Sequence, residues 1–221
     1  MPALGHRDAA GVRMQIEQGV AVARFGFGHD RERDPRLPPG QYDTGSGFPV
    51  LTAEVSPKLT ADDWTFRVDG LVGEAKTWNW KTAHVLQGSS YEGDIHCVTT
   101  WSKLGTSFSG VSIDTFLAET GVRPEATHVV AWSHTGYTTN LPLSEVTGGK
   151  AWIVWEHEGQ PLPPQHGGPV RMLVPHLYFW KSAKWIGGLR LLDHDEPGFW
   201  EVRGYHALGD PWREQRYDGD E

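Results

Sequence analysis

Short stretches that alternate apolar and polar residues dominate the chain from residue 49 onward. Such alternation is typical of half-buried β-strands, particularly where β-branched and aromatic residues fill the apolar positions. The strands predicted in this way are Pro49–Val55, Trp64–Val72, Thr127–Ser133, Ala151–Glu156, Gly168–Pro175 and Trp185–Leu192. Helical patterns are few and short, one over Trp78–Leu86 and one beginning at Asp114. The pattern therefore predicts a mixed α+β domain in which strands predominate.

The order of these segments excludes two common nucleotide-binding architectures. Strands do not alternate with long helices, so a doubly wound parallel sheet is disfavoured. The chain contains neither GxGxxG nor GxxxxGK[ST], which removes the usual dinucleotide and nucleoside-triphosphate loops. A single β-rich domain built on packed or barrel-like sheets remains.

The two ends of the chain differ in composition from its middle. Residues 1–35 carry mixed charge without a long apolar run, and we expect a flexible N-terminal arm there. The proline-containing connector Arg36–Gln41 begins the globular part, because proline disfavours helix in the residue before it. We expect one globular domain over residues 36–215 and a disordered tail over residues 216–221.

Composition limits the partners and the location. The formal net charge is -8 and no cluster of Lys or Arg offsets it locally, so nucleic acid is not an expected partner. No run approaches the roughly 20 apolar residues that cross a bilayer, so we expect no membrane association. The first forty residues contain no signal-peptide core and no twin arginine, which favours a cytoplasmic protein. The 11 Trp indicate broad aromatic surfaces in a core or a pocket.

The single cysteine, Cys97, lies in the segment Tyr91–Gly110, YEGDIHCVTTWSKLGTSFSG. One cysteine excludes an intrachain disulfide, an iron–sulfur site, a CxxCH haem site and a structural cysteine–zinc site built from this chain alone. A β-branched run and a Gly-rich loop follow it, an arrangement that places the thiol at the end of a strand and facing a loop-lined cavity. A thiolate in that position suits a soft metal. The alternative is a thiol that only packs in the core.

A second informative stretch runs from Pro161 to Leu189. His166–Gly168 allows the backbone to approach a ligand closely, because glycine accepts unusual dihedral angles and presents bare N–H groups. Arg171 lies in an apolar strand, and a buried arginine generally requires an anion or a carboxylate partner. With Ser182 and the ammonium groups of Lys181–Lys184, these side chains suit one phosphate. The alternative is a structural arginine–carboxylate pair beside two solvated lysines.

Three motifs, HCVTTWS around Cys97, HGGPVR from His166 and SAKW from Ser182, resemble the molybdopterin-binding domain of the sulfite oxidase family. This family includes assimilatory nitrate reductases and bacterial protein methionine-sulfoxide reductases. The resemblance runs from about Arg36 into the tail and implies a single β-rich mixed domain of that type. It implies Mo-molybdopterin, with one molybdenum and one pterin, and oxygen-atom transfer to or from a small substrate of the sulfite or sulfoxide type.

The resemblance also implies roles by position. Cys97 is the implied metal ligand, and Trp101 and Tyr178 join it as the implied catalytic residues. The residues implied to contact the cofactor are His96, Cys97, Ser133, His166, Arg171, Ser182, Ala183 and Lys184. Candidates for the pocket wall or for proton delivery, each of which also fits an ordinary core or surface role, are Trp101, His134, Tyr137, His176 and Tyr178.

Departures from the family bear on the substrate and the assembly. Sulfite oxidases place one arginine where Ser102 stands here and another where this chain has Gly45–Phe48, so a pocket for a small anion is the weaker interpretation. Trp101 and Ser102 resemble the methionine-sulfoxide reductase branch, whereas His166 resembles sulfite oxidases, which leaves the substrate open. The sequence ends before the immunoglobulin-like dimerisation domain of sulfite oxidases, so we expect a monomer or a complex with another subunit.

The chain has no haem, flavin or iron–sulfur motif of its own, so electrons are expected to move through a separate redox partner protein or carrier. The aromatic segment Gly204–Trp212 is a candidate docking edge for that partner. Two other classes stay open. One is a Trp-rich β-domain that binds a ligand such as carbohydrate, with Cys97 packed in the core. The other is a non-haem iron or zinc site, for which no HExxH motif is present. Its candidate ligands are His96, His134, His157, His166, His176 and Glu156.

Overall fold

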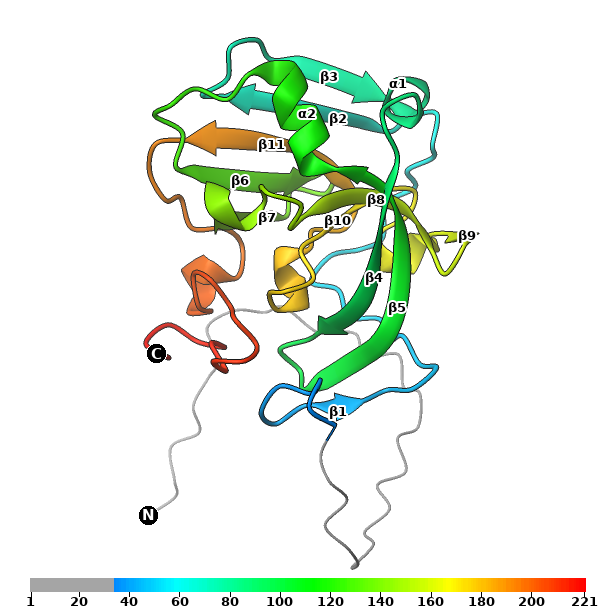
Figure 1. The fold of residues 1–221 in the computed structure, drawn as a ribbon, viewed down its shortest axis with the longest axis vertical. Coiled ribbons are helices and arrows are strands. Elements are labelled where there is room, and N and C mark those ends of the chain that lie inside the picture. Colours follow the sequence, from blue (N-terminus) through cyan, green and yellow to red (C-terminus); the bar gives the residue numbers. More distant parts are fainter. Residues whose placement is uncertain (1–33) are drawn as a thin grey trace, which may run out of the picture.

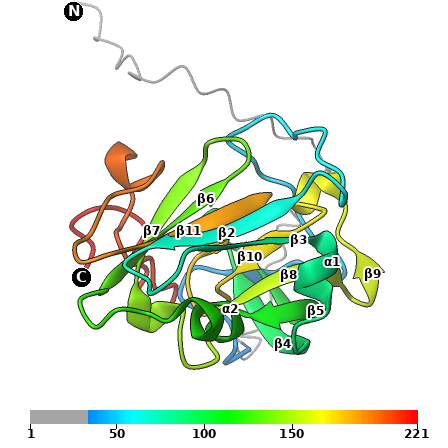
Figure 2. The ribbon, with the colours of Figure 1, turned by 90° about the horizontal axis from the view of Figure 1, so that it is seen from above.

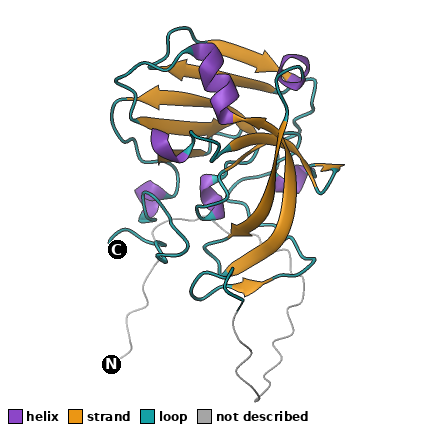
Figure 3. Ribbon diagram, viewed as in Figure 1, coloured by secondary structure: helices purple, strands orange, loops and turns teal. Residues whose placement is uncertain are grey.

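The computed structural model describes residues 34–221 (Figure 1). The expected N-terminal arm therefore lies almost wholly outside the described residues, and the domain boundaries stay predictions. The described part is built on two sheets with few helices, which Figure 3 shows by colour. The prediction of a mixed α+β domain dominated by strands is confirmed.

One sheet has five strands. In spatial order these are β3 (Lys76–Asn79), β2 (Thr65–Gly70), β11 (Ile186–Leu192), β6 (His128–Ser133) and β7 (Thr138–Pro142). The central pair β2–β11 is parallel and the other pairs are antiparallel. A parallel neighbour requires a long connection, and here the whole chain between residues 71 and 185 supplies it.

The second sheet is built around the longest strand. Its path is β1 (Tyr42–Asp43), β5 (Trp101–Ser112), β8 (Trp152–His157) and β10 (Arg171–Leu173), with β4 (Ser89–His96) paired to β5 and β9 (Gln160–Pro161) paired to β8. Figure 1 shows the β4–β5 hairpin running from the region of α2 to β1 at the lower end. The hairpin loop therefore lies far from the five-stranded sheet.

The helices are short and have defined ends. The α-helices are α1 (Trp80–His84) and α2 (Ile113–Thr120), and the 3-10 turns are η1 (Leu143–Glu145), η2 (Pro164–His166), η3 (Phe179–Lys181) and η4 (Glu201–Arg203). Asn79 caps α1 by accepting from the Thr82 N–H, and Ser112 caps α2 by accepting from the Asp114 N–H. Gly121, with φ 67, ends α2, because glycine tolerates positive φ.

The main core lies between the two sheets. Figure 2 shows α2 and the second sheet on the same side of the five-stranded sheet. Buried side chains from both sheets meet there, among them Phe66 of β2, Phe116 of α2, Ile153 of β8 and Leu189 of β11. A smaller cluster inside the bend of the second sheet contains Cys97. The cysteine thus sits between a packed core and the loops that follow the strands.

Five of the six predicted strands are confirmed, with boundaries shifted by a few residues. Pro49–Val55 was wrong, since no strand forms there. Pro49, Leu51 and Ala53 are half-buried and line a cavity instead of pairing in a sheet, and Val55 is exposed. The helix predicted over Trp78–Leu86 is shorter, because its first two residues belong to β3. No helix in the described part is long and apolar enough to span a membrane.

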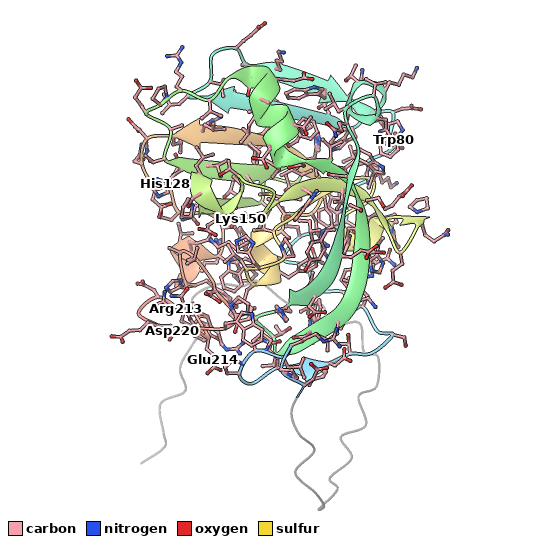
Figure 4. All side chains as sticks on the ribbon, in the orientation of Figure 1. Trp80, His128, Lys150, Arg213, Glu214 and Asp220 are labelled. Carbon is pink, nitrogen blue, oxygen red and sulfur yellow. The ribbon has the colours of Figure 1, made fainter. Side chains whose placement is uncertain are left out.

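Where we expected a disordered tail at residues 216–221, the structure has a turn. The Asp220 carboxylate accepts hydrogen bonds from the backbone N–H groups of Arg216 (2.9 Å) and Tyr217 (2.7 Å). The Arg216 guanidinium in turn donates to the carbonyl of Val98 in the β4–β5 loop. The C-terminal segment, on which Figure 4 labels Arg213, Glu214 and Asp220, therefore packs against the loop that carries Cys97.

Candidate active site

A cavity of about 130 Å³ opens where the β4–β5 loop, the loop before β2 and the segment between β10 and β11 meet. Many aromatic side chains line it, among them Phe48, Trp101, Phe179, Trp180, Trp185 and Trp200. Cys97, Arg171 and Lys184 line the same cavity. Residues from distant parts of the sequence thus converge on one site.

Cys97 follows the last residue of β4 and begins a tight turn. Its N–H donates to the carbonyl of Trp101 at 2.8 Å, and its carbonyl accepts from the Thr100 N–H at 3.0 Å. Thr100 adopts φ 74, an uncommon value for a residue with a side chain. The Gln41 amide adds a 3.0 Å hydrogen bond to the Cys97 carbonyl. Backbone bonds on both sides therefore fix the position of the thiol.

The thiol of Cys97 is 7% exposed and faces the cavity. Burial raises its pKa, and the nearby Thr99 hydroxyl, 3.2 Å from the sulfur, and the Lys184 ammonium oppose that rise. The free protein therefore holds a protonated thiol. A bound metal cation would remove the proton, because coordination favours the thiolate outright.

Arg171 is almost fully buried in β10 and lies over the ring of Phe179. Its guanidinium donates to the carbonyls of His166 (2.8 Å), Ser182 (2.8 Å) and Met172 (3.3 Å). Within residues 34–221 it forms no ion pair with a carboxylate, so the structural arginine–carboxylate alternative is wrong. Burial lowers its pKa to about 9. A bound anion would stabilise the charged guanidinium and so oppose this effect of burial.

Lys184 places a second cation in the wall. Its ammonium donates to the carbonyls of Leu51 and Gln165, each at 2.7 Å, and burial together with Arg171 lowers its pKa to about 7. Two of its three N–H donors are used in this way, which leaves one for a ligand. Lys181 instead pairs with Glu201 inside the fold at 2.6 Å. Lys181 is buried and Lys184 is half-buried, in contrast to the two solvated lysines considered above.

The HGGPVR motif forms the adjoining wall. His166 stacks on Phe48 with ring centroids 3.9 Å apart, and burial and the neighbouring Arg171 lower its pKa to about 4. Gly167 has φ 101, and a Cβ atom there would lie 2.9 Å from the Lys184 Cβ. Gly168 leaves even less space, since a Cβ would lie 2.0 Å from the Leu162 carbonyl oxygen. The two glycines permit a close approach between chain segments.

Seven of the residues implied by the resemblance line the cavity: Cys97, Trp101, His166, Arg171, Ser182, Ala183 and Lys184. Ser182 also accepts from the Val174 N–H at 2.8 Å through its hydroxyl. Trp101 is 4% exposed, and its indole N–H has no hydrogen-bond partner within the described chain. An unpaired buried donor in a cavity wall is suited to a ligand oxygen.

Three implied residues lie outside the lining. His96 bonds the Ser102 hydroxyl at 2.8 Å, because successive strand residues face opposite sides and Cys97 takes the cavity side. Ser133 bonds Thr135 at 2.6 Å in the β6–β7 turn. Tyr178 stacks behind Trp180 with centroids 5.4 Å apart. Their contacts with a cofactor or substrate stay predictions.

The wider set of wall candidates divides in the same way. Tyr137 lines the cavity, whereas His134 bonds the Thr65 carbonyl and His176 bonds Glu145. Among the lining residues with an ionisable side chain, two were missed, Glu54 and Tyr205. Glu54 fell in a segment predicted as a strand, and Tyr205 fell in the aromatic segment interpreted as a docking edge. No sequence motif marks either residue, and only the tertiary structure places them at the cavity.

The donor set fits molybdopterin better than a histidine-ligated metal. In the described part of the chain, no group of three or more His, Cys, Asp or Glu side chains is placed to hold a metal ion. A single soft thiol therefore requires further ligands from a non-protein group, which dithiolene sulfurs supply. Arg171 and Lys184 retain N–H donors for a phosphate. The iron or zinc alternative is not supported by this arrangement.

Comparisons with known proteins agree with the site. A family model described as an oxidoreductase molybdopterin binding domain matches residues 53–200. An uncharacterized oxidoreductase, YuiH, of Bacillus subtilis (strain 168) is 41% identical over 197 residues, which are 88% of this chain and 99% of that protein. The protein-methionine-sulfoxide reductase catalytic subunit MsrP of Gluconobacter oxydans (strain 621H) is 29% identical over 199 residues, 77% of this chain and 61% of MsrP.

A solved structure shows the same fold. The sulfane dehydrogenase SoxCD from Paracoccus pantotrophus superposes with a TM-score of 0.59 at 19% identity, over 63% of this chain and 41% of that chain. The β-rich architecture is therefore that of the sulfite oxidase molybdopterin-binding domain. The chain belongs to the oxidoreductase molybdopterin-binding family, and its cofactor is Mo-molybdopterin.

Proposed function

We propose that this oxidoreductase transfers an oxygen atom to or from a small substrate of the sulfite or sulfoxide type, at a molybdenum held by Cys97. The observation that carries the proposal is the convergence of the Cys97 thiol, Arg171 and Lys184 on one aromatic cavity. The Cys97 thiolate suits the metal of the cofactor, and the two cations, Arg171 and Lys184, suit its phosphate. When bound, Mo-molybdopterin supplies two-electron oxygen-atom transfer, which no protein side chain can perform.

The residues of this chain would bind the cofactor and orient it. Cys97 would hold the metal, and its turn keeps the sulfur at one place in the cavity. Lys184 and Arg171 would bind the phosphate through their remaining N–H donors, with Ser182 and Ala183 shaping that wall. The aromatic wall excludes water, which strengthens each electrostatic contact inside the cavity.

Two side chains offer protons or hydrogen bonds at the substrate position. The Trp101 indole N–H is buried and unpaired within the described chain. Burial raises the pKa of Tyr205, so its phenol stays protonated at neutral pH and serves as a donor. We propose that Tyr205, which lines the cavity, has the catalytic role that the sequence analysis predicted for Tyr178.

Electrons are proposed to pass through a separate partner. The name of MsrP describes it as a catalytic subunit, which supports division of labour between polypeptides in a relative. Gly204–Trp212 remains the proposed docking edge, and a monomeric state and a cytoplasmic location stay predictions. Removal of the chain after Asp193 would not test this docking edge cleanly, because it would also remove Tyr205 from the cavity wall. The substitution Trp212→Ser, at a half-exposed position, is the better test of docking.

The deciding experiment is elemental and pterin analysis of protein purified from a host that makes molybdopterin. We expect about one molybdenum and one pterin per chain in the wild type. Cys97→Ser should lose the metal or change its visible absorption while the protein stays folded. His128→Asn, on β6, serves as the matched control and should load normally.

The alternative of a Trp-rich binding module makes the opposite prediction. Such a protein would be colourless and metal-free in the same host, beside a control molybdoenzyme that loads. Cys97→Ser would then leave ligand binding unchanged. Molybdenum bound at a level that Cys97→Ser does not alter would also contradict the proposed role of the thiol.

A further inference from the structure

A buried polar network connects the two ends of the turn that carries Cys97. Gln41, which directly precedes β1, is 7% exposed. Its amide N–H donates to the Cys97 carbonyl at 3.0 Å, and its amide oxygen accepts from the Ser102 hydroxyl at 3.3 Å. Neither Gln41 nor Ser102 lines the cavity. A buried amide is costly unless its polar atoms are paired, and here both ends of the amide bond to the segment that carries the thiol.

The hydrogen bonds of this network have a single consistent direction. A carbonyl oxygen can only accept, so Gln41 must turn its NH2 group to Cys97 and its oxygen to Ser102. The Ser102 hydroxyl therefore gives its proton to Gln41 and accepts a bond from Nδ1 of His96, 2.8 Å away. His96, Gln41 and Ser102 are all buried. Each member orients the next, which fixes the amide that bonds the Cys97 carbonyl.

The C-terminal segment holds the same turn at its second residue. The Arg216 guanidinium donates to the Val98 carbonyl and lies over the ring of Tyr178, 5.1 Å from its centroid. Burial raises the pKa of Tyr178, and Arg216 and the Gln41 side chain oppose that rise, so both groups lie close to its hydroxyl. The turn is thus bonded from outside by one side chain before β1 and by another in the C-terminal segment.

The turn needs this support because its backbone is strained. Thr100 has a φ of 74, a conformation that is disfavoured for a residue with a side chain. Its N–H donates to the Cys97 carbonyl at 3.0 Å across the turn. Strained conformations persist where the surrounding contacts over-determine them. The same carbonyl receives the Gln41 bond, so loss of Gln41 should loosen the turn and with it the thiol.

We propose that Gln41 is a positioning residue for the metal ligand, which holds the Cys97 turn so that the thiolate meets molybdenum in one orientation. The inference rests on the proposed function, in which Cys97 holds the metal. Groups that orient a metal ligand commonly change metal affinity by about 10–100-fold when they are lost. Gln41 does not line the cavity, so its effect must pass through the backbone of Cys97.

The test uses the holoenzyme, purified from a host that makes molybdopterin, and compares Gln41→Met with the wild type. Methionine keeps the length of the side chain and removes both hydrogen bonds. Two spectra are recorded per bound molybdenum, the visible absorption of the thiolate–metal bond and the electron paramagnetic resonance of the partly reduced metal. Both should shift in Gln41→Met, and the rate of molybdenum loss on dialysis should rise about tenfold. A role confined to folding would leave both spectra unchanged.

Two further variants serve as comparisons. Ser102→Ala leaves the Gln41 N–H on Cys97 but removes the hydroxyl that orients the amide, so it should shift the spectra in the same direction by less. It also keeps the inference open to refutation where Gln41→Met fails to fold, since unchanged spectra in Ser102→Ala would then overturn it. Arg123→Met removes a side-chain bond to the Val72 carbonyl, outside the cavity, and should match the wild type in spectra and metal retention.

Hydrogen exchange reports the turn without reference to the metal spectra. Exchange of the Thr100 N–H should be about fivefold faster in Gln41→Met, which corresponds to the loss of one hydrogen bond. An unchanged exchange rate would show that Gln41 does not hold the turn and would overturn the inference. Faster exchange with unchanged spectra would also overturn it, because the turn would then move without any effect on the metal.

Cys97→Ser separates failure of this inference from failure of the proposed function. If Cys97→Ser changes the spectra or the metal content and Gln41→Met does not, metal binding through the thiol stands and the positioning role is overturned. If Cys97→Ser has the spectra and metal content of the wild type, the proposed role of the thiol fails and the inference fails with it.

Discussion

The ammonium group of Lys184 donates a 2.7 Å hydrogen bond to the backbone carbonyl of Leu51, which lies 133 residues earlier in the chain. A second bond of 2.7 Å reaches the Gln165 carbonyl. One side chain thus joins the loop before β2, the HGGPVR segment and the start of β11. The same group is proposed to bind phosphate, so cofactor binding and closure of the wall depend on one residue.

Replacement of Lys184 tests this connection. Lys184→Met should lower the pterin content of the purified protein at least several-fold, because one charge-assisted contact with the phosphate is lost. It should also speed hydrogen exchange over residues 48–55, since Leu51 loses its tether. Lys150→Met is the control, because that exposed lysine also bonds a backbone carbonyl, of Ser144, outside the cavity. Normal pterin content in Lys184→Met would contradict the phosphate assignment.

Gly167→Ala tests the close approach of the HGGPVR segment to Lys184. The added Cβ would lie 2.9 Å from the Lys184 Cβ at a φ of 101, so both a clash and backbone strain are introduced. We expect a loss of about 1–3 kcal/mol in the free energy of unfolding, measured with urea. Gly136→Ala, with φ 92 and open space around it, should suffer from the strain alone. Equal losses in the two variants would show that no clash occurs.

Local patterns in the sequence were sufficient to predict several strands and part of the site. Alternating apolar positions predicted β2, β6, β8 and β11, and the three motifs predicted the thiol and the two cations of the cavity lining, Cys97, Arg171 and Lys184. A strand ending at Cys97 was expected, and β4 is that strand, but the long pairing of β4 with β5 was not predicted. The residues of this hairpin are largely Ser, Gly, Thr and charged, and two polar strands leave no local apolar period. Such strands are held by their partner rather than by propensity.

The site was harder to predict where only the tertiary structure determines which residues line the cavity. Pro49–Val55 has the composition of a strand, yet Pro49, Leu51 and Ala53 line a cavity and the backbone of the segment pairs with no sheet. Tyr205 and Tyr178 are both aromatic neighbours of Trp180, and only the three-dimensional arrangement shows that Tyr205 reaches the wall. Sequence motifs identify a site that consists of contiguous residues. They do not identify a side chain that the fold brings in from elsewhere.

His166 provides a prediction about pH. Its pKa is lowered from the ordinary value of 6.5 to about 4, chiefly by burial, so the unfolded chain binds more protons than the folded chain between these values. Stability is therefore lost as the pH falls from about 6.5 towards 4, by an amount on the order of 1–3 kcal/mol from this residue. Urea unfolding of the cofactor-free protein at pH 7 and pH 5 should show the loss.

The contribution of His166 is isolated by substitution. His166→Gln should reduce the difference in unfolding free energy between pH 7 and pH 5, whatever its stability at pH 7. His128→Gln, at the start of β6, should leave that difference as it is in the wild type. An undiminished difference in His166→Gln would mean that other buried histidines, such as His96, cause the loss.

The ion pair of Lys181 and Glu201 supports the aromatic wall from behind. The two groups lie 2.6 Å apart at 0% and 3% side-chain exposure, and burial lowers the Lys181 pKa while Glu201 opposes that change. The same Glu201 oxygen accepts from the Trp180 indole N–H at 3.0 Å. Trp180 and Trp200 both line the cavity. Loss of the pair should therefore disturb the site as well as the fold.

Lys181→Met should lower the free energy of unfolding by about 3–5 kcal/mol, because it leaves Glu201 buried without its cation. The double variant Lys181→Met with Glu201→Gln should lose less than the sum of the single variants, since the uncompensated charge is removed while the amide oxygen can still accept from Trp180. The exposed pair of Lys76 and Glu119, 3.7 Å apart, provides the reference, and breaking it should cost less than about 1 kcal/mol. Additive losses at Lys181 and Glu201 would show that the two side chains contribute independently, and the wall would then depend on the Glu201 hydrogen bond to Trp180 alone.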